Sequence, residues 1–243
     1  MKKRFWLAVA AAIAGSGVFA ALDSRSYVQE GIVAQWDAIE NGARGMHNPN
    51  ATGWVDLSGH NHNLNTLATG STWNENSLVF PGGKYGMAAV FNGTTAVNIG
   101  DYASYDLAYT ETSRSNSAPF IFGFGNYKGY CLYPTRNSIQ TENKQGWALP
   151  QAEMTLNVPH MAYADYGTPG STVATNLVYD GTVLERDSNN DGWTQSTSGL
   201  GYANNSNWSF HGGLHALRLY NRSLTPAEVG LNRAIDLVRF AGK

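Results

Sequence analysis

The 243-residue chain has few charges, a single cysteine and no long apolar run after its first residues. Only 14% of the residues are charged, and 16 Lys and Arg face 18 Asp and Glu. Proteins that bind nucleic acid usually carry clustered Lys and Arg that contact the phosphates, so this composition argues against a nucleic-acid partner. Cys131 is the only cysteine, which excludes an intrachain disulfide. Its strand-like surroundings, YKGYCLY, predict a buried and inert thiol.

Residues 1–20 have the pattern of a secretory signal peptide. Residues 2–4 are basic, residues 5–14 are apolar, and residues 18–20 (VFA) form a small-x-small cleavage site. The apolar part is shorter than the ~18 residues that span a bilayer. We therefore expect an exported chain without a membrane span, either secreted or periplasmic. Without this leader, 13 Lys and Arg remain against 18 Asp and Glu, a net charge of −5.

The remaining residues, 21–243, predict one all-β domain. Gly, Asn, Ser, Thr and Tyr are frequent, and turn signals separate short apolar runs, which is typical of a two-sheet antiparallel β-sandwich. Asn92-Gly93 and Asp180-Gly181 are expected to form tight hairpin turns, because these residue types tolerate positive φ. The run GLHALRLY (213–220) predicts a strand with His215 and Leu217 on the same face.

One helix is predicted, and it closes the chain. TPAE (225–228) is a capping box with proline at the first helical position. Leu231, Ile235 and Val238 follow at i, i+4 and i+7, which predicts an apolar stripe packed against the sandwich.

Together these features resemble the LamG-like jelly roll of the concanavalin A-like lectin/glucanase superfamily. The segments that carry the resemblance are GIVAQWD (31–37), DLSGHNHN (56–63), VFNGTTAVNIG (90–100), NLVYDGTVL (176–184) and FHGGLHALRLYNRSLTPAEV (210–229). The resemblance implies a jelly-roll sandwich, and residues 37–53 look like an insertion before the DLSG segment.

The DLSGHNHN segment raises the question of a metal site. As a turn, it would use Asp56 and Ser58 to bond local backbone and Gly59 to supply positive φ. His60 and His62 could instead contribute to a zinc site, but zinc needs three or more ligands and the spacing of the other histidines requires none of them. The turn is the favoured interpretation.

A second polar run, DSNNDGW, resembles a calcium loop. Asp187, Asn189 and Asp191 occupy loop positions 1, 3 and 5, and the carbonyl of Trp193 falls at position 7. Position 12 is Ser198 rather than glutamate, so Ca²⁺ would bind weakly, near the millimolar range. A polar turn without a metal is the alternative.

Exposed aromatic residues could stack on sugar rings. Trp193, Tyr202 and Trp208 lie in a Gly/Asn/Ser-rich segment whose amides could bind hydroxyl groups, although packing in the core is the alternative for each. Trp36 and Trp54 are expected in the core.

The carboxylate pattern argues against a glucanase. The nearest approach to its motif is ERDSNN, where Glu185 and Asp187 are present but Asn190 replaces the last glutamate. We therefore expect a non-catalytic module that binds a glycan or a cell-surface protein through loops at the sandwich edge. A structural or adhesive domain of a cell-envelope assembly, with no small ligand, is the second hypothesis, and a carbohydrate-active enzyme is the third.

Overall fold

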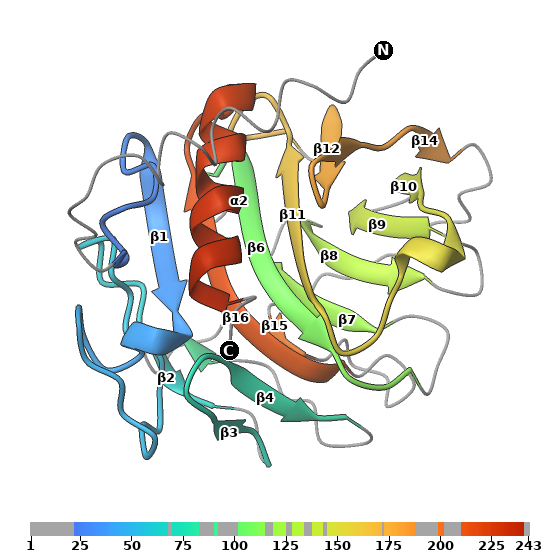
Figure 1. Cartoon of the computed structure of the whole chain (residues 1–243). Coiled ribbons are helices and arrows are strands. Elements are labelled where there is room, and N and C mark those ends of the chain that lie inside the picture. The colour runs from blue at the N-terminus through green and yellow to red at the C-terminus, as the bar shows by residue number, and fades with distance from the viewer. Residues whose placement is uncertain are drawn as a thin grey trace.

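The computed structural model describes residues 22–67, 70–82, 90–91, 102–114, 119–124, 128–133, 138–142, 145–171, 173–187, 199–201 and 210–240. Strands form most of it, and one long helix, α2 (Pro226–Phe240), follows the last strand (Figure 1). The strands are β1 (Ile32–Asp37), β2 (Leu64–Thr66), β3 (Thr72–Trp73), β4 (Leu78–Pro81), β5 (Val90–Phe91), β6 (Ser104–Glu111), β7 (Phe120–Phe124), β8 (Lys128–Tyr133), β9 (Ser138–Glu142), β10 (Gln145–Ala148), β11 (Pro159–Asp165), β12 (Asn176–Tyr179), β13 (Thr182–Val183), β14 (Arg186–Asp187), β15 (Gly199–Leu200) and β16 (His211–Tyr220). Two short 3-10 helices are η1 (Ala38–Glu40) and η4 (Gln151–Glu153).

The strands form two main antiparallel sheets. The large sheet has the order β13-β12-β11-β6-β16-β4-β3, and the small sheet has the order β14-β10-β9-β8-β7-β15. β16 is long enough to pair with three other strands. β6 pairs along one of its edges, while β4 and β1 share the other. The predicted antiparallel β-sandwich with a C-terminal helix is confirmed.

The core lies between the two sheets. Alternate residues of β6, including Tyr105 and Leu107, face the small sheet and are fully buried. The Tyr105 ring meets Phe122 edge-on at 4.8 Å, and its hydroxyl donates to the Gly129 carbonyl at 2.9 Å. Trp36 and Trp54 are buried as expected, and so is Cys131. Burial raises the pKa of the Cys131 thiol, which keeps it protonated and inert.

Helix α2 covers the outer face of the large sheet, in front of β16, β6 and β11 (Figure 1). Its predicted capping box is confirmed. The backbone N–H of Thr225 donates to Glu228 Oε2 at 2.8 Å, and the N–H of Glu228 donates to Thr225 Oγ1 at 3.3 Å. No helix in the described part of the chain combines the length and the apolar composition that crossing a bilayer requires.

The predicted apolar stripe of this helix is partly wrong. Ile235 is buried and Leu231 is partly buried, but Val238 is 60% exposed. Asp236 and Arg239 are buried instead. The reason is the sheet beneath, which presents buried charged groups that the helix must match with charged groups of its own.

The predicted face of His215 is also wrong. β16 shifts register against β6 at this residue, which is the signature of a β-bulge. Leu217 stays in the sandwich core, whereas the His215 ring stacks on Phe240 of α2 with ring centroids 5.0 Å apart.

Of the two predicted turns, one is described and confirmed. Asp180 and Gly181 have φ angles of 47° and 87°, so both central residues of the β12–β13 turn are left-handed. Asn92-Gly93 lies outside the described residues, as does the leader at 1–20.

Candidate functional site

The predicted calcium and aromatic residues mostly lie outside the described part of the chain. This applies to Asn189, Asp191, Trp193, Tyr202 and Trp208. The backbone of Asp187 is described and closes β14, where it pairs with Gly146 of β10. The calcium loop and the stacking aromatics therefore stay predictions.

The DLSG segment forms the predicted turn. The Asp56 carboxylate accepts hydrogen bonds from the backbone N–H groups of Gln35 and Ser58, both at 2.9 Å, and of His62 at 2.9 Å. The Ser58 hydroxyl also donates to Asp56 at 2.8 Å, and Gly59 has a φ of 93°. Asp56 thus fastens the turn to β1 through Oδ1, while Oδ2 bonds within the turn.

The two histidines of this segment lie next to one another on the surface. The rings of His60 and His62 stack with centroids 6.4 Å apart. Across the described residues, no group of three or more His, Cys, Asp or Glu side chains is arranged to hold a metal ion. His47 is engaged elsewhere, since its Nδ1 lies 2.9 Å from the Ala38 carbonyl oxygen.

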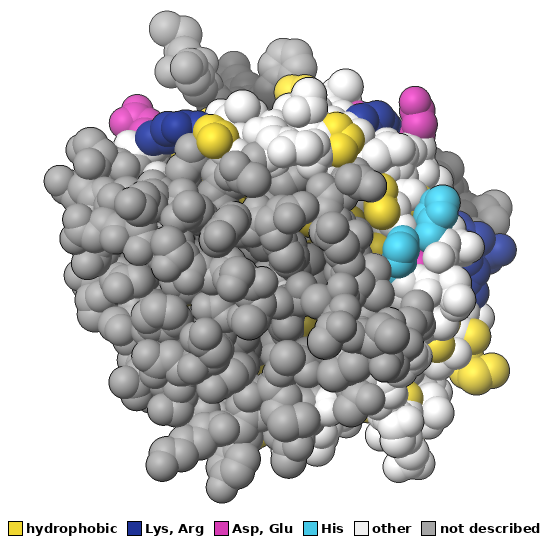
Figure 2. All heavy atoms as spheres, turned by 180° about the vertical axis from the view of Figure 1, so that it is seen from behind, with side chains coloured by type: hydrophobic (Ala, Val, Ile, Leu, Met, Phe, Trp, Pro, Cys, Tyr) yellow, Lys and Arg dark blue, Asp and Glu magenta, His cyan; other side chains and the backbone are white. Residues whose placement is uncertain are grey.

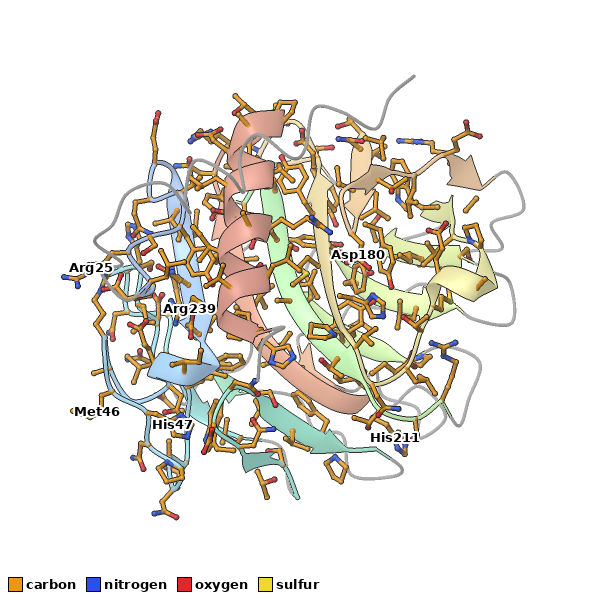
Figure 3. All side chains as sticks on the ribbon, viewed as in Figure 1. Arg25, Met46, His47, Asp180, His211 and Arg239 are labelled. Carbon is orange, nitrogen blue, oxygen red and sulfur yellow. The ribbon has the colours of Figure 1, made fainter. Side chains whose placement is uncertain are left out.

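A groove of about 300 Å³ opens beside this turn, and we call it the amide groove. It is lined by Asn41, Gly42 and Asn48, by residues 51–55 and by residues 63–65. Its volume is at the lower end of the range for small-molecule sites. In Figure 3, Met46 and His47 mark the loop that carries much of the groove, at the end of the sandwich near β2 and β3.

Hydrogen bonds between asparagine side chains and the backbone hold this loop in a fixed shape. Asn41 is fully buried and clamps the loop from inside. Its Oδ1 accepts from the N–H of Asn48 at 2.6 Å, and its Nδ2 donates to the Asn48 carbonyl at 2.9 Å. Asn48 Oδ1 then accepts from the N–H of Asn50 at 3.0 Å. The groove is therefore formed before any ligand arrives.

Two tryptophans support the wall of the groove. Trp54 is buried, and Trp73 meets it edge-on with ring centroids 5.3 Å apart. Trp73 Nε1 donates to the Ala51 carbonyl at 2.9 Å, which ties β3 to the groove lining. A Cβ on Gly53 would lie 2.3 Å from the Leu64 carbonyl oxygen, so this close approach requires glycine.

The groove is not predicted by any local pattern in the sequence. The sequence indicates residues 37–53 only as an insertion before the DLSG segment. The available signal was a series of asparagines within the insertion and after the turn, at positions 41, 48, 50, 63 and 65. Sequence alone does not show that the two segments meet, because their contact depends on the pairing of Trp54 with Leu64.

A hydrogen-bonded group near the opposite edge of the large sheet, formed by Thr155, His160 and Asp180, has the composition of a catalytic triad but not its geometry. His160 Nδ1 lies 2.7 Å from Asp180 Oδ2. Its Nε2 lies 2.8 Å from the Thr155 carbonyl oxygen and 3.3 Å from the Thr155 hydroxyl. Nε2 must donate to that carbonyl, so it has no lone pair with which to accept a proton from the hydroxyl. Burial opposes the charged ring, but the bonds to Asp180 and to the Thr155 carbonyl together raise the pKa of His160.

A second polar cluster fastens α2 to the large sheet. The Arg218 guanidinium of β16 is fully buried and pairs with Asp236 of the helix at 2.6 Å and with Asp106 of β6. Asn232 of the helix donates to Asp106 at 2.5 Å, and Arg239 pairs with Asp37 at 3.0 Å. Its members are buried and paired with one another, which supports a role in holding α2 on the sheet.

The comparisons with known proteins concern the fold alone. No protein-family model and no curated protein matches the chain. Among solved structures it is similar to Trypanosoma rangeli sialidase, with 15% identity, a TM-score of 0.55 and coverage of 88% of this chain and 34% of that one. A mutant of that sialidase displaying trans-sialidase activity matches with 13% identity, a TM-score of 0.56 and coverage of 89% and 34%. The chain thus spans about a third of the length of these sialidases, and what it shares with them is a β-sandwich fold.

Proposed function

We propose that this chain is an exported, non-catalytic module that binds a glycan in the amide groove. The observation that carries the proposal is the groove itself, a preformed hollow of about 300 Å³ lined by amide side chains and loop backbone. Amides donate and accept hydrogen bonds, which suits the hydroxyl groups of a sugar. A site that needs no rearrangement also avoids much of the entropic cost of binding.

The described part of the surface supports a polar ligand more than a large apolar partner. Figure 2 shows that hydrophobic side chains on the described part of the rear face lie singly among polar ones. The most exposed apolar residues, Met46, Val183 and Val238, belong to a loop, to β13 and to α2. Scattered residues of this kind are normal for a soluble surface and do not form a protein-docking patch.

The family assignment is a further part of the proposal. We infer a divergent LamG-like module of the concanavalin A-like superfamily. The order of the five sequence segments supports this, as do the DLSG turn and the capping box after the last strand. Because one sandwich fold hosts many functions, the fold supports the binding role only as an analogy.

A blocking variant tests the site directly. Thr52 lines the groove with an exposed side chain, so Thr52→Trp should fill the groove without disturbing the core. We expect wild type to bind members of a glycan array, and Thr52→Trp to lose at least tenfold in affinity by calorimetry. Thr182→Trp is the matched control, since Thr182 is exposed on β13 at the other end of the large sheet.

Three outcomes would contradict the proposal. Absence of binding to every glycan favours the structural or adhesive hypothesis. Release of reducing sugar from a polysaccharide by the pure protein would show an enzyme instead. Equal loss of binding in both tryptophan variants would place the site outside the amide groove.

A further inference from the structure

We infer that the amide groove selects an uncharged saccharide and discriminates against acidic sugars; this inference rests on the proposed function. The described lining contains no Asp, Glu, Lys, Arg or His side chain. A sugar carboxylate entering the groove would lose water without gaining a cation, and an unpaired desolvated charge is costly. The part of the lining that the structure describes therefore offers no cation to an acidic sugar such as sialic acid, which is bound in one matched sialidase structure.

The charged groups nearest in sequence to the lining are engaged elsewhere. Asp56 follows the lining residue Val55, but its carboxylate accepts four hydrogen bonds from its own turn and from β1. Glu40 precedes Asn41, and its carboxylate bonds Ser24, Gly45 and Arg239. Arg44, on the groove loop, donates to the Leu57 carbonyl. Asp56 and Glu40 are thus held within the protein framework, whereas the exposed Arg44 is bound to the DLSG turn by this hydrogen bond.

The Asn63 amide keeps hydrogen-bonding capacity for a neutral ligand. Asn63 Oδ1 accepts from the N–H of Asp56 at 2.8 Å, and its Nδ2 donates to Asn61 at 2.7 Å. A carboxamide has two donor hydrogens and two acceptor lone pairs, so these bonds use half of its capacity and fix its orientation. The remaining donor and acceptor match a sugar hydroxyl, which is itself both a donor and an acceptor. Thr52 adds a hydroxyl of the same kind to the lining.

Matched sugar pairs test the inference. Glucose-terminated and galactose-terminated oligosaccharides are compared with their glucuronic and galacturonic acid counterparts, which replace one CH₂OH by a carboxylate. We expect the acidic member to bind at least tenfold more weakly than its neutral partner. Binding of the neutral member should change less than twofold between 50 and 500 mM NaCl, because screening acts only on charge.

A second test of the inference introduces a positive charge into the groove. Thr52→Lys should reduce the preference for the neutral member at least threefold and make binding of the acid depend on salt. Thr52→Gln, similar in reach but uncharged, should leave the preference unchanged. Calorimetry and urea unfolding of both variants check that each is folded.

The outcomes separate this inference from the proposed function. If wild type prefers the acidic members and Thr52→Trp abolishes that binding, the groove is a glycan site but not a neutral one. If no member of either series binds, the proposed function fails and this inference fails with it. If binding survives Thr52→Trp, sugars are bound elsewhere on the protein, which contradicts both.

Discussion

His160 Nδ1 lies 2.7 Å from Asp180 Oδ2, and the other ring nitrogen lies 2.8 Å from the Thr155 carbonyl oxygen. Both partners are acceptors, so both ring nitrogens must donate, and only the imidazolium form can do this. In its charged form the residue thus holds the loop before β11 and the turn after β12 together.

This geometry predicts a stability that depends on pH. The pKa of His160 is raised in the folded protein, so its contribution is complete below the unfolded value of about 6.5 and is lost as pH rises through the folded value. Urea unfolding at intervals from pH 5.5 to 9 should show stability falling over this range. His160→Gln should flatten the fall, whereas His60→Gln, at an exposed position, should leave it intact. Equal slopes in wild type and His160→Gln would show that the ring is neutral.

Arg218→Leu should be among the most destabilising single changes on the large sheet. It would leave Asp106 and Asp236 buried close together without their cation, at a cost of about 3–5 kcal/mol. Arg222→Leu is the control, because the Arg222–Glu228 pair is about a quarter exposed and should contribute less than about 1 kcal/mol. The free energy of unfolding in urea measures both. Similar midpoints for the two variants would show that the buried cluster does not fasten α2.

Gly53→Ala should distort the amide groove. The added Cβ would lie 2.3 Å from the Leu64 carbonyl, so the two backbone segments must separate, at a cost of about 1–3 kcal/mol. Gly170→Ala makes the same chemical change where no atom lies within 4 Å, and it should be neutral or slightly stabilising. Thermal unfolding of the two variants gives the comparison. Unchanged stability in Gly53→Ala would mean that Gly53 and the Leu64 carbonyl lie farther apart than the structure shows.

Calcium binding at residues 187–193 is a prediction that titration can test. With Asp187, Asn189 and Asp191 as side-chain ligands, the dissociation constant should lie near 1 mM. At tenfold excess over that constant, Ca²⁺ should stabilise the fold by about 1.4 kcal/mol. Asp191→Asn should remove this stabilisation, and Asp23→Asn, at the other end of the sequence, should keep it. A calcium response that survives Asp191→Asn would place the ion elsewhere.

Local sequence rules predicted the features that depend on neighbours in the chain. The Asp180-Gly181 turn and the Thr225–Glu228 capping box each involve residues no more than three apart. Their geometry follows from backbone conformational preferences and from short hydrogen bonds, so the residues themselves were sufficient.

The incorrect predictions share a different cause. Val238 was placed toward the core by helical spacing, but the buried Arg218 on the sheet selects Asp236 for the helix face beneath it. His215 was placed by strict alternation, which a bulge interrupts. The amide groove depends on the Asn41 clamp and on a contact between segments about ten residues apart, and no local pattern indicates that geometry.

The position of β16 has a consequence for how the chain reaches its native state. This strand holds β1, β4 and β6 together, yet it comprises residues 211–220 of 243. Until β16 has been synthesised, β1, β4 and β6 lack the strand that joins them. Such pairing between distant segments is slow to nucleate. The large sheet should therefore be completed only after residue 220 has been synthesised, and chains truncated before β16 should fail to join β1, β4 and β6.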